Sequence, residues 1–363
     1  MSQKPHTPYK KVAVLSVILT VGISLLVLAF SWTSVTSSAK AIPVAIAGPT
    51  AQVEAVTAVL AESGTFDIST VDTRADAVAG IESRELLGAI VLGDEPEVLA
   101  TSAGSPIVSQ ILGAVAAQLG QQASAQAGAT VTVPVTDVVP LASTDPRGAG
   151  LSVASFPLVM MGMLGGILFS LIVVGTRQRL VAIALYSIVS AFAVGGILQG
   201  LLGILQGNYL LNVAALAVAT LATAAFIVGL HSLLGQKGIP IGAITTMLIA
   251  NPISSAAQPM QFMVGPWGAI GQWLVPGASA SLLRDLSYFP SAASLGFSWL
   301  VLAVWAIGGI ALTVIGGNFR KTHVVADDTP ASLQPDALEP ATVQQAAQQP
   351  TTVQPAALQP AGV

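Results

Sequence analysis

The sequence predicts an α-helical polytopic membrane protein: about six transmembrane helices in a one-plus-five arrangement, with an extracytoplasmic α/β domain inserted after the first helix. Of the 363 residues, 53% are hydrophobic and only 8% are charged. A soluble domain carries about 25% charged residues, so a soluble chain of this composition would expose large apolar patches. The apolar residues also form blocks of about 20, the length that crosses a bilayer as a helix. One segment of ordinary polarity, residues 32–148, separates the first block from the others.

The first apolar block, residues 12–30, follows a short basic segment at residues 1–11 and contains no charge. We predict a transmembrane helix over residues 12–31. The alternative is a cleaved signal peptide, because Ala39-Lys40-Ala41 resembles an A-x-A cleavage site. The apolar block is longer than the roughly 7–15 residues usual in a signal peptide, and the cleavage-like site lies far beyond its end. We therefore favour a retained anchor.

Residues 32–148 alternate between short apolar runs and amphipathic segments, and they carry most of the acidic residues. Alternating strands and helices are typical of a small α/β domain. Strands are expected at residues 42–47, 65–71, 87–92, 97–101 and 131–139, and helices at residues 51–62, 74–83 and 107–122.

Residues 149–318 are predicted to form a five-helix membrane bundle, with spans at residues 151–174, 180–203, 209–230, 239–253 and 300–315. Before the last span, residues 259–286 are apolar but interrupted by Gly265-Pro266 and Pro276-Gly277. An unbroken helix is disfavoured there. We expect two short interfacial or re-entrant helices, with Trp267 and Trp273 near the lipid headgroups.

The distribution of basic residues predicts the orientation. Arg and Lys concentrate in cytoplasmic loops. Placing the N-terminus in the cytoplasm also puts there the basic residues Lys10, Lys11, Arg177, Arg179, Lys237, Arg320 and Lys321. Both termini are then cytoplasmic. Residues 319–363 are predicted to be a disordered cytoplasmic tail, because their Pro, Gln, Ala and Thr cannot bury a core.

The residue inventory argues against several activities. The chain has no cysteine and three histidines, all in predicted cytoplasmic segments, so the external domain cannot hold a Ser-His-Asp or Cys-His arrangement. No G-x-x-x-x-G-K-[ST] nucleotide motif occurs. A basic patch for nucleic acid is also missing. Asp94, Glu95 and Glu97 could bind calcium, but a solvated turn is the favoured interpretation. We expect no enzyme activity, cofactor or metal site.

A few polar residues in the apolar half are candidate functional residues. Asp285 is the only acid between residues 151 and 317, which disfavours ion coupling through titrating carboxylates. Arg284 and Asp285 could gate an external vestibule or contact lipid headgroups, although a local pair that anchors the helix is favoured. Gln199 and Asn251 are expected to form hydrogen bonds between helices rather than to contact substrate.

Small residues recur at helical spacing, which lets helix backbones approach closely. They are Gly162, Gly165 and Gly166 in one span, then Gly196, Gly200, Gly203 and Gly207 in and after the next. Tight packing within one bundle is the favoured interpretation. The alternative is a homodimer seam or a moving interface.

This layout resembles the permease subunits of type-2 ABC exporters, and more closely their bacterial phage-infection-protein (YhgE/Pip-like) relatives. Segments that look similar are residues 77–92 (AVAGIESRELLGAIVL), 140–150 (PLASTDPRGAG) and 251–284, which includes GPWGAIGQWLVPGAS. The resemblance covers residues 10–320. It implies a multi-pass protein of the bacterial cytoplasmic membrane in contact with membrane lipids, acting as a homodimer or heteromer, with a possible separate ATPase subunit.

The chain departs from the family pattern in two places. Only eleven residues precede the first predicted span, which leaves no amphipathic surface helix. The predicted cytoplasmic loop at residues 175–179 is too short for a substantial coupling helix. We expect an export permease that moves a hydrophobic or amphipathic substrate, such as an envelope lipid or a toxic compound. The alternative is a non-transporting envelope assembly, scaffold or receptor protein that displays its external domain.

Overall fold

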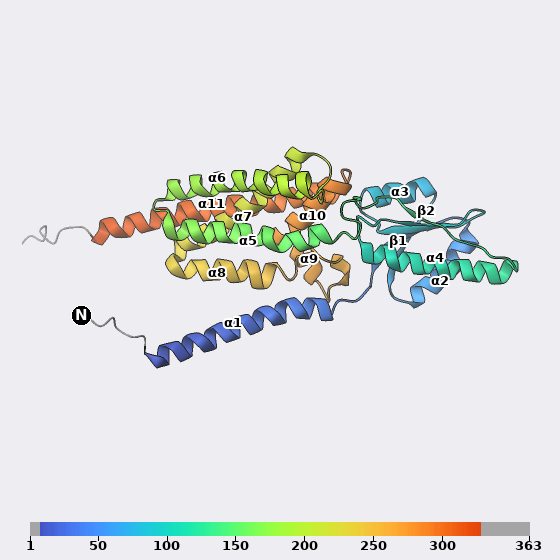
Figure 1. Cartoon of the computed structure of the whole chain (residues 1–363), viewed down its shortest axis with the longest axis horizontal. Helices are drawn as coiled ribbons and strands as arrows, with labels where there is room; N and C mark the ends of the chain where they lie inside the picture. Colours follow the sequence, from blue (N-terminus) through green and yellow to red (C-terminus); the bar gives the residue numbers. More distant parts are fainter. Residues whose placement is uncertain (1–7, 328–363) are drawn as a thin grey trace, which may run out of the picture. The chain divides into compact units, whose positions relative to one another are not determined.

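The computed structural model describes residues 8–327, which form an α/β domain and a bundle of long helices (Figure 1). Residues 1–7 and 328–363, which include most of the predicted disordered tail, lie outside the described residues. The last helix, α11 (Ser294–Asp327), continues past residue 319, where the tail was predicted to begin. No proline interrupts the chain between residues 319 and 327, so nothing in this segment forces the helix to end earlier.

The α/β domain contains a five-stranded mixed sheet in the order β2-β1-β3-β4-β5. β1 pairs in parallel with β2 and β3, whereas β4 runs antiparallel to β3 and parallel to β5. The strands predicted at residues 87–92 and 97–101 are therefore both present, and they pair with each other. The strands are β1 (Ile42–Ala47), β2 (Phe66–Val71), β3 (Gly88–Val91), β4 (Glu97–Ala100) and β5 (Val135–Asp137).

Three helices cover the two faces of this sheet. α2 (Thr50–Glu62) and α4 (Pro106–Ala127) pack over Ile42, Val44 and Ile46 of β1. α3 (Arg74–Glu82) covers the opposite face, where its Ile81 packs against Ala45. A strand covered on both faces reads as a continuous apolar run, which explains the sequence IPVAIA in β1.

Five stretches within residues 8–327 are long and apolar enough to cross a membrane, which is consistent with a polytopic membrane protein. Four of the five are single spans close to the predicted ones. The exception is Tyr209–Ala250, which is 42 residues long. The five stretches are Tyr9–Val35, Ala149–Ile172, Thr176–Leu201, Tyr209–Ala250 and Ser294–Phe319.

The 42-residue stretch folds back on itself. α7 (Tyr209–Leu234) ends at Gly235, whose φ of 66° lies in the left-handed region. The chain then returns along α7 as α8 (Gly238–Ile244), followed by a π-helical segment, Thr245–Ala250. A Cβ at Gly238 would lie 2.1 Å from the Leu230 carbonyl oxygen, so the tight reversal requires glycine there. The returning segment, 238–250, is about 20 Å long and is shorter than the predicted span at residues 239–253.

Helix α7 is the centre of the bundle and packs against α5 (Ala149–Ile172) and α6 (Thr176–Gly195). Glycines allow the close approach. A Cβ at Gly162 would lie 2.7 Å from Cβ of Thr223, and one at Gly166 would lie 3.1 Å from Cα of Ala224. The predicted packing role of these glycines within one bundle is therefore confirmed.

Gly196 and Gly200 behave differently. They lie in a π-helical segment, Gly196–Leu201, and a Cβ at Gly200 would have no neighbour within 4 Å. Gly203 and Gly207 lie in the following turn, with φ of 62° and 74°. These four glycines do not form one α-helical face, because the α-helix ends at Gly195. The prediction that these four glycines share one helix face is therefore wrong.

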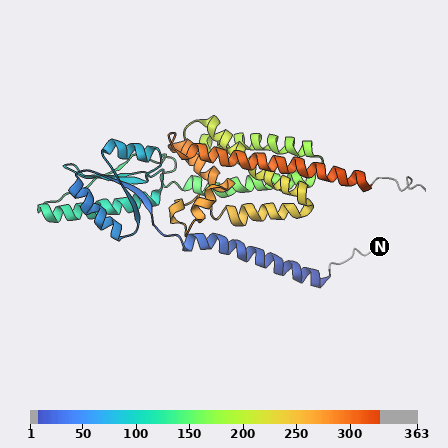
Figure 2. The same ribbon diagram turned by 180° about the vertical axis from the view of Figure 1, so that it is seen from behind.

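The broken segment before α11 contains two short helices, as predicted. α9 (Trp267–Gln272) and α10 (Val275–Tyr288) follow a single 3-10 turn, Met260–Phe262. In both ribbon views this segment (orange) lies beside the α/β domain at one end of the bundle (Figures 1 and 2). The domain and the bundle therefore share a boundary, called here the seam, formed by residues 83–84, 103–104, 255–262 and 284–298.

Candidate functional site

The seam is built around Asp285, a carboxylate on the buried face of α10. Val275, Ala278 and Leu282 form an apolar stripe at helical spacing, and Asp285 continues it at the next position. Its side chain is fully buried. A buried carboxylate requires hydrogen-bond or ion-pair partners. Ser294 Oγ donates a hydrogen bond to Asp285 Oδ2 at 2.6 Å.

The ionic partner of Asp285 is Arg84, which belongs to the α/β domain. Nη1 of Arg84 donates to Oδ1 of Asp285 in a short ion pair. Arg84 follows Ser83, the C-cap residue of α3, and has a φ of 62°, a conformation that glycine usually adopts at this position. An arginine there accepts backbone strain. Its side chain also lies over the ring of Phe289, 5.8 Å from the centroid.

The predicted local pair between Arg284 and Asp285 is therefore wrong. Adjacent residues on a helix point about 100° apart, so the two side chains face different surroundings. The nearby carboxylate of Asp145 accepts hydrogen bonds from the backbone N–H groups of Ala149 and Gly150 at the start of α5. Within residues 8–327, no ion pair joins Arg284 or Arg147 to a carboxylate.

Arg284 is half-buried, and its Nη2 donates to the carbonyl oxygen of Ala256 at 3.4 Å. Burial, and secondly the neighbouring Arg84, lower the pKa of Arg284, whereas Asp285 and Tyr288 raise it; the resulting pKa is about 10. The guanidinium stays charged at neutral pH. Arg284 is thus a cation in a partly desolvated place without a matching anion.

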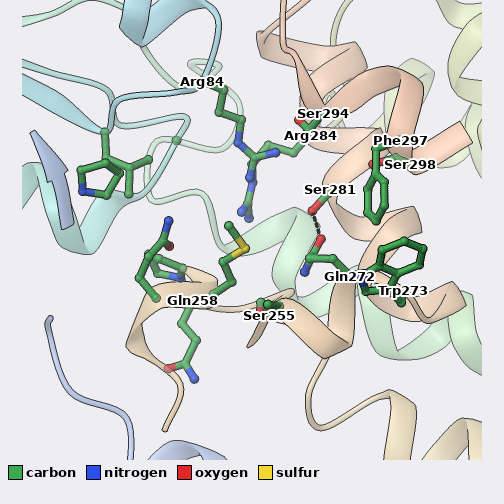
Figure 3. A pocket seen from close by; sticks show the side chains of 17 residues that line it. Arg84, Ser255, Gln258, Gln272, Trp273, Ser281, Arg284, Ser294, Phe297 and Ser298 are labelled. Carbon is green, nitrogen blue, oxygen red and sulfur yellow. Dashed lines mark hydrogen bonds between the residues drawn. The ribbon is translucent and has the colours of Figure 1, made fainter. Parts of the chain in front are cut away.

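A cavity of about 340 Å³ lies at the seam beside these arginines. Arg84 and Arg284 converge on one side of it, and Trp273 and Phe297 lie together on another (Figure 3). The two aromatic rings meet edge to face at 4.8 Å. The residues that line the cavity include no Asp or Glu. The cavity therefore has a cationic end and an aromatic, apolar end.

A second cavity of about 260 Å³ shares Arg284 and Gln258 with the first. Arg147 lines this second cavity, and its lining also contains no acid. Ser37 Oγ donates to Gln258 Oε1 at 2.7 Å, which ties the segment after the first helix to the same wall. Arg284 thus stands between two adjoining cavities.

Two phenylalanines fasten the domain to the bundle on either side of the cavity. Phe262 packs into the apolar core of the α/β domain with Ile42 and Leu87. Phe289 is fully buried against Ala103 of the domain. The backbone N–H of Ala293 also donates to the carbonyl oxygen of Ser83 at 3.3 Å. Apolar burial and backbone pairing therefore surround the ion pair.

The remaining predicted residues lie apart from this cavity or at its edge. Gln199 accepts a hydrogen bond from Asn212 of α7 at 2.9 Å, which confirms the predicted bond between helices. Asn251 is buried just after the π-helical segment. Trp267 is 41% exposed at the start of α9. Gly196 and Gly200 lie in the same helical end as Gln199.

The acidic turn of the domain does not assemble a metal site. Glu97 Oε1 accepts from Arg74, and Oε2 accepts from Thr136 at 2.9 Å. Calcium would have to displace both partners. No group of three or more His, Cys, Asp or Glu side chains suited to a metal occurs among residues 8–327.

Arg84 was missed at the sequence level. The chain separation between Arg84 and Asp285 is 201 residues, and no local pattern connects them. A signal was nevertheless present, because Asp285 occupies an inward position of an amphipathic helix and so requires a distant cation.

No family model matches this chain, and neither a curated protein nor a solved structure matches it.

Proposed function

We propose that the protein is an export-type permease of the bacterial cytoplasmic membrane that handles an amphipathic substrate at its external end. The observation that carries the proposal is the cavity at the seam, which joins two arginines to an aromatic wall. An amphipathic molecule presents the complementary pair of surfaces. Phe297 and Ser298, which line the cavity, lie in the first turns of the apolar helix α11. The cavity is therefore lined in part by the start of an apolar stretch long enough to cross a membrane.

The overall arrangement supports the same proposal. The structure contains one apolar helix, an α/β domain, and a bundle with broken helices before the last span. This layout resembles that of type-2 ABC permeases. In this proposal the α/β domain is extracytoplasmic, six helical segments serve as the membrane part, and both termini are cytoplasmic. The chain is not itself an enzyme, and a separate ATPase subunit supplies the energy.

The test is affinity purification of the tagged protein in mild detergent, followed by mass spectrometry and an ATPase assay. The proposal predicts a stoichiometric nucleotide-binding subunit and vanadate-sensitive turnover. An Arg284→Gln variant controls for the cavity, because it should keep the partner while losing any substrate stimulation of turnover. Recovery of envelope proteins alone, with no ATPase, would contradict the proposal.

A second candidate function is a non-transporting envelope scaffold or receptor. One observation favours it: only residues 173–175 connect α5 to α6. Arg179 then donates from Nε to the carbonyl oxygen of Val173 at 2.7 Å, which closes the end of α5. This connection offers no coupling helix to an ATPase. The same purification separates the two functions, since a scaffold is expected to retain envelope partners.

A further inference from the structure

The charge balance at the seam leaves one cation without a partner. Two guanidinium groups, Arg84 and Arg284, and one carboxylate, Asp285, carry a net charge of one positive. The carboxylate is committed to Arg84 and Ser294. Removing a charge from water without a counter-charge costs free energy. A site that keeps such a cation half-buried is therefore prepared to receive an anion.

The position of Arg284 fits this role. Its only hydrogen bond among the described residues is a long one to a backbone carbonyl oxygen, so most of its five N–H donors remain available. A guanidinium binds phosphate or carboxylate oxygens through two parallel hydrogen bonds. Both cavities that Arg284 lines contain a second arginine and no acid. An entering anion would meet no like charge in either.

We propose that the seam cavity binds the anionic headgroup of a single-chain amphiphile, with Arg284 as the principal ligand and the apolar chain against Trp273 and Phe297. The inference rests on the proposed function and narrows its substrate class. Arg84 stays paired with Asp285, and its positive charge adds to the electrostatic attraction of the anionic headgroup. Met260 and Leu87 complete the apolar lining.

The binding test uses the full chain in dodecyl maltoside and a 12-carbon lysophosphatidic acid as the probe, with affinity measured by isothermal titration calorimetry. Arg284→Gln should weaken binding about 10- to 100-fold, the loss expected for a charge-assisted hydrogen bond. Arg284→Lys should lose less, because it keeps the charge without the fork. Arg74→Gln is the matched control, since Arg74 lies on the exposed surface of the domain, and it should bind as the wild type does.

Two further ligands distinguish binding of an anionic amphiphile from binding of a neutral amphiphile or of free phosphate. Monolaurin has the same chain without phosphate and should bind at least about tenfold more weakly than the lysophosphatidic acid. Inorganic phosphate alone should not compete at the same concentration. Equal binding of monolaurin would overturn the anion site, and full competition by inorganic phosphate would overturn the amphiphile in favour of a free anion. Unchanged binding by Arg284→Gln would also overturn the proposal.

A measurement on the wild type covers the case in which the variants fail to fold. A lysophosphatidic acid with a photoreactive diazirine in its chain should label peptides that contain residues 255–261 and 294–298. Labelling confined to the lipid-facing surface of the first helix would contradict the proposal. Both experiments are independent of transport. Binding without an ATPase partner would leave the anion site standing while the permease function fails, and an ATPase partner without anion binding would do the reverse.

Discussion

The surface of the α/β domain and the seam each hold one pair of arginine and carboxylate, but in different surroundings. Arg74 and Glu97, on the domain surface, are 51% and 17% exposed, whereas Arg84 and Asp285, at the seam, are 18% and 0% exposed. An exposed pair contributes little, because water and salt screen it. Breaking a buried pair leaves a charge without water or partner. The Arg74–Glu97 pair is therefore expected to contribute little to stability, whereas loss of either partner from the Arg84–Asp285 pair is expected to be strongly destabilising.

The largest effect should come from breaking the buried pair. Asp285→Asn leaves the Arg84 guanidinium without its counter-charge, and we expect a loss of about 3–5 kcal/mol in the free energy of unfolding. The thermal unfolding midpoint in detergent measures this change. The double variant Arg84→Gln with Asp285→Asn should recover part of the loss, because both charges are gone.

The corresponding cycle with Arg74→Gln and Glu97→Gln is the control for the exposed pair. It should show weak coupling, about 0.2–1 kcal/mol. Comparable coupling in the two cycles would mean that burial does not distinguish these pairs, and the contrast between the two regions would be lost.

The next largest effect concerns backbone contact in the broken helices. A Cβ at Gly271 would lie 1.7 Å from the carbonyl oxygen of Ile253, so Gly271→Ala should cost about 1–3 kcal/mol. Gly113→Ala in α4 is the matched control, because a Cβ there meets nothing within 4 Å. Alanine should stabilise that helix by about 0.5–1 kcal/mol. Equal thermal midpoints for the two variants would contradict the close packing at Gly271.

A smaller effect is expected from the polar contact inside the bundle. Gln199→Ala removes one of the two acceptors of the Asn212 amide, the other being the carbonyl oxygen of Gln206. The variant also loses the hydrogen bond that Gln199 Nε2 donates to the carbonyl oxygen of Gly207 at 2.9 Å. The loss of these two bonds should cost about 1–2 kcal/mol. Gln118→Ala on α4 of the domain serves as the comparison. A midpoint unchanged by Gln199→Ala alone would show that water replaces the missing contact.

The smallest effect is a pH dependence at the exposed pair. The hydrogen bond from Arg74 lowers the pKa of Glu97, partly offset by burial. A lowered carboxyl pKa stabilises the folded state above the unfolded value of about 4.3. This contribution is lost as pH falls through the lower folded pKa. Arg74→Gln should therefore flatten the pH dependence of the midpoint as the pH falls below about 4.3. An identical pH profile in the variant would contradict the assignment.

The α/β domain was predicted almost element by element, because water separates its inside from its outside. Residues 42–47 were predicted as a strand and form β1, and the segments around α2, α3 and α4 were predicted as helices. Local signals mark the ends. Thr73 and Asp76 form a capping box at the start of α3, and Ser105 caps α4 before Pro106.

In the bundle, the sequence predicted the helices but not their neighbours. No part of the apolar window of Tyr9–Val35 is buried, compared with 61% for Tyr209–Ala250, although both are strongly apolar. When every face of a helix is apolar, hydropathy does not indicate which face packs. Glycines carry that information only in part. Gly166 marks a contact with α7, whereas Gly200 marks none.

The sequence predicted which charged residues of α10 belong to the candidate site, but not which residues they contact. Arg284 and Asp285 stood out as charges in an apolar region, and both lie at the seam. Their partners did not follow from the sequence. Arg284 and Asp285 are adjacent and were predicted to pair with each other, whereas Asp285 pairs with Arg84, 201 residues away. Trp273 was predicted near the headgroups and lines the cavity, while its position relative to lipid stays a prediction.

The most direct test of the seam is disulfide trapping, which the cysteine-free chain makes simple. Ser83→Cys combined with Ala293→Cys places two thiols at residues whose backbones hydrogen-bond at 3.3 Å. We predict that mild oxidation in membranes cross-links this double variant rapidly. The control combines Ala293→Cys with Ser63→Cys, a substitution on the exposed end of α2, and should not cross-link. No cross-link in the first double variant, or equal cross-linking in both, would contradict a fixed seam and the cavity that depends on it.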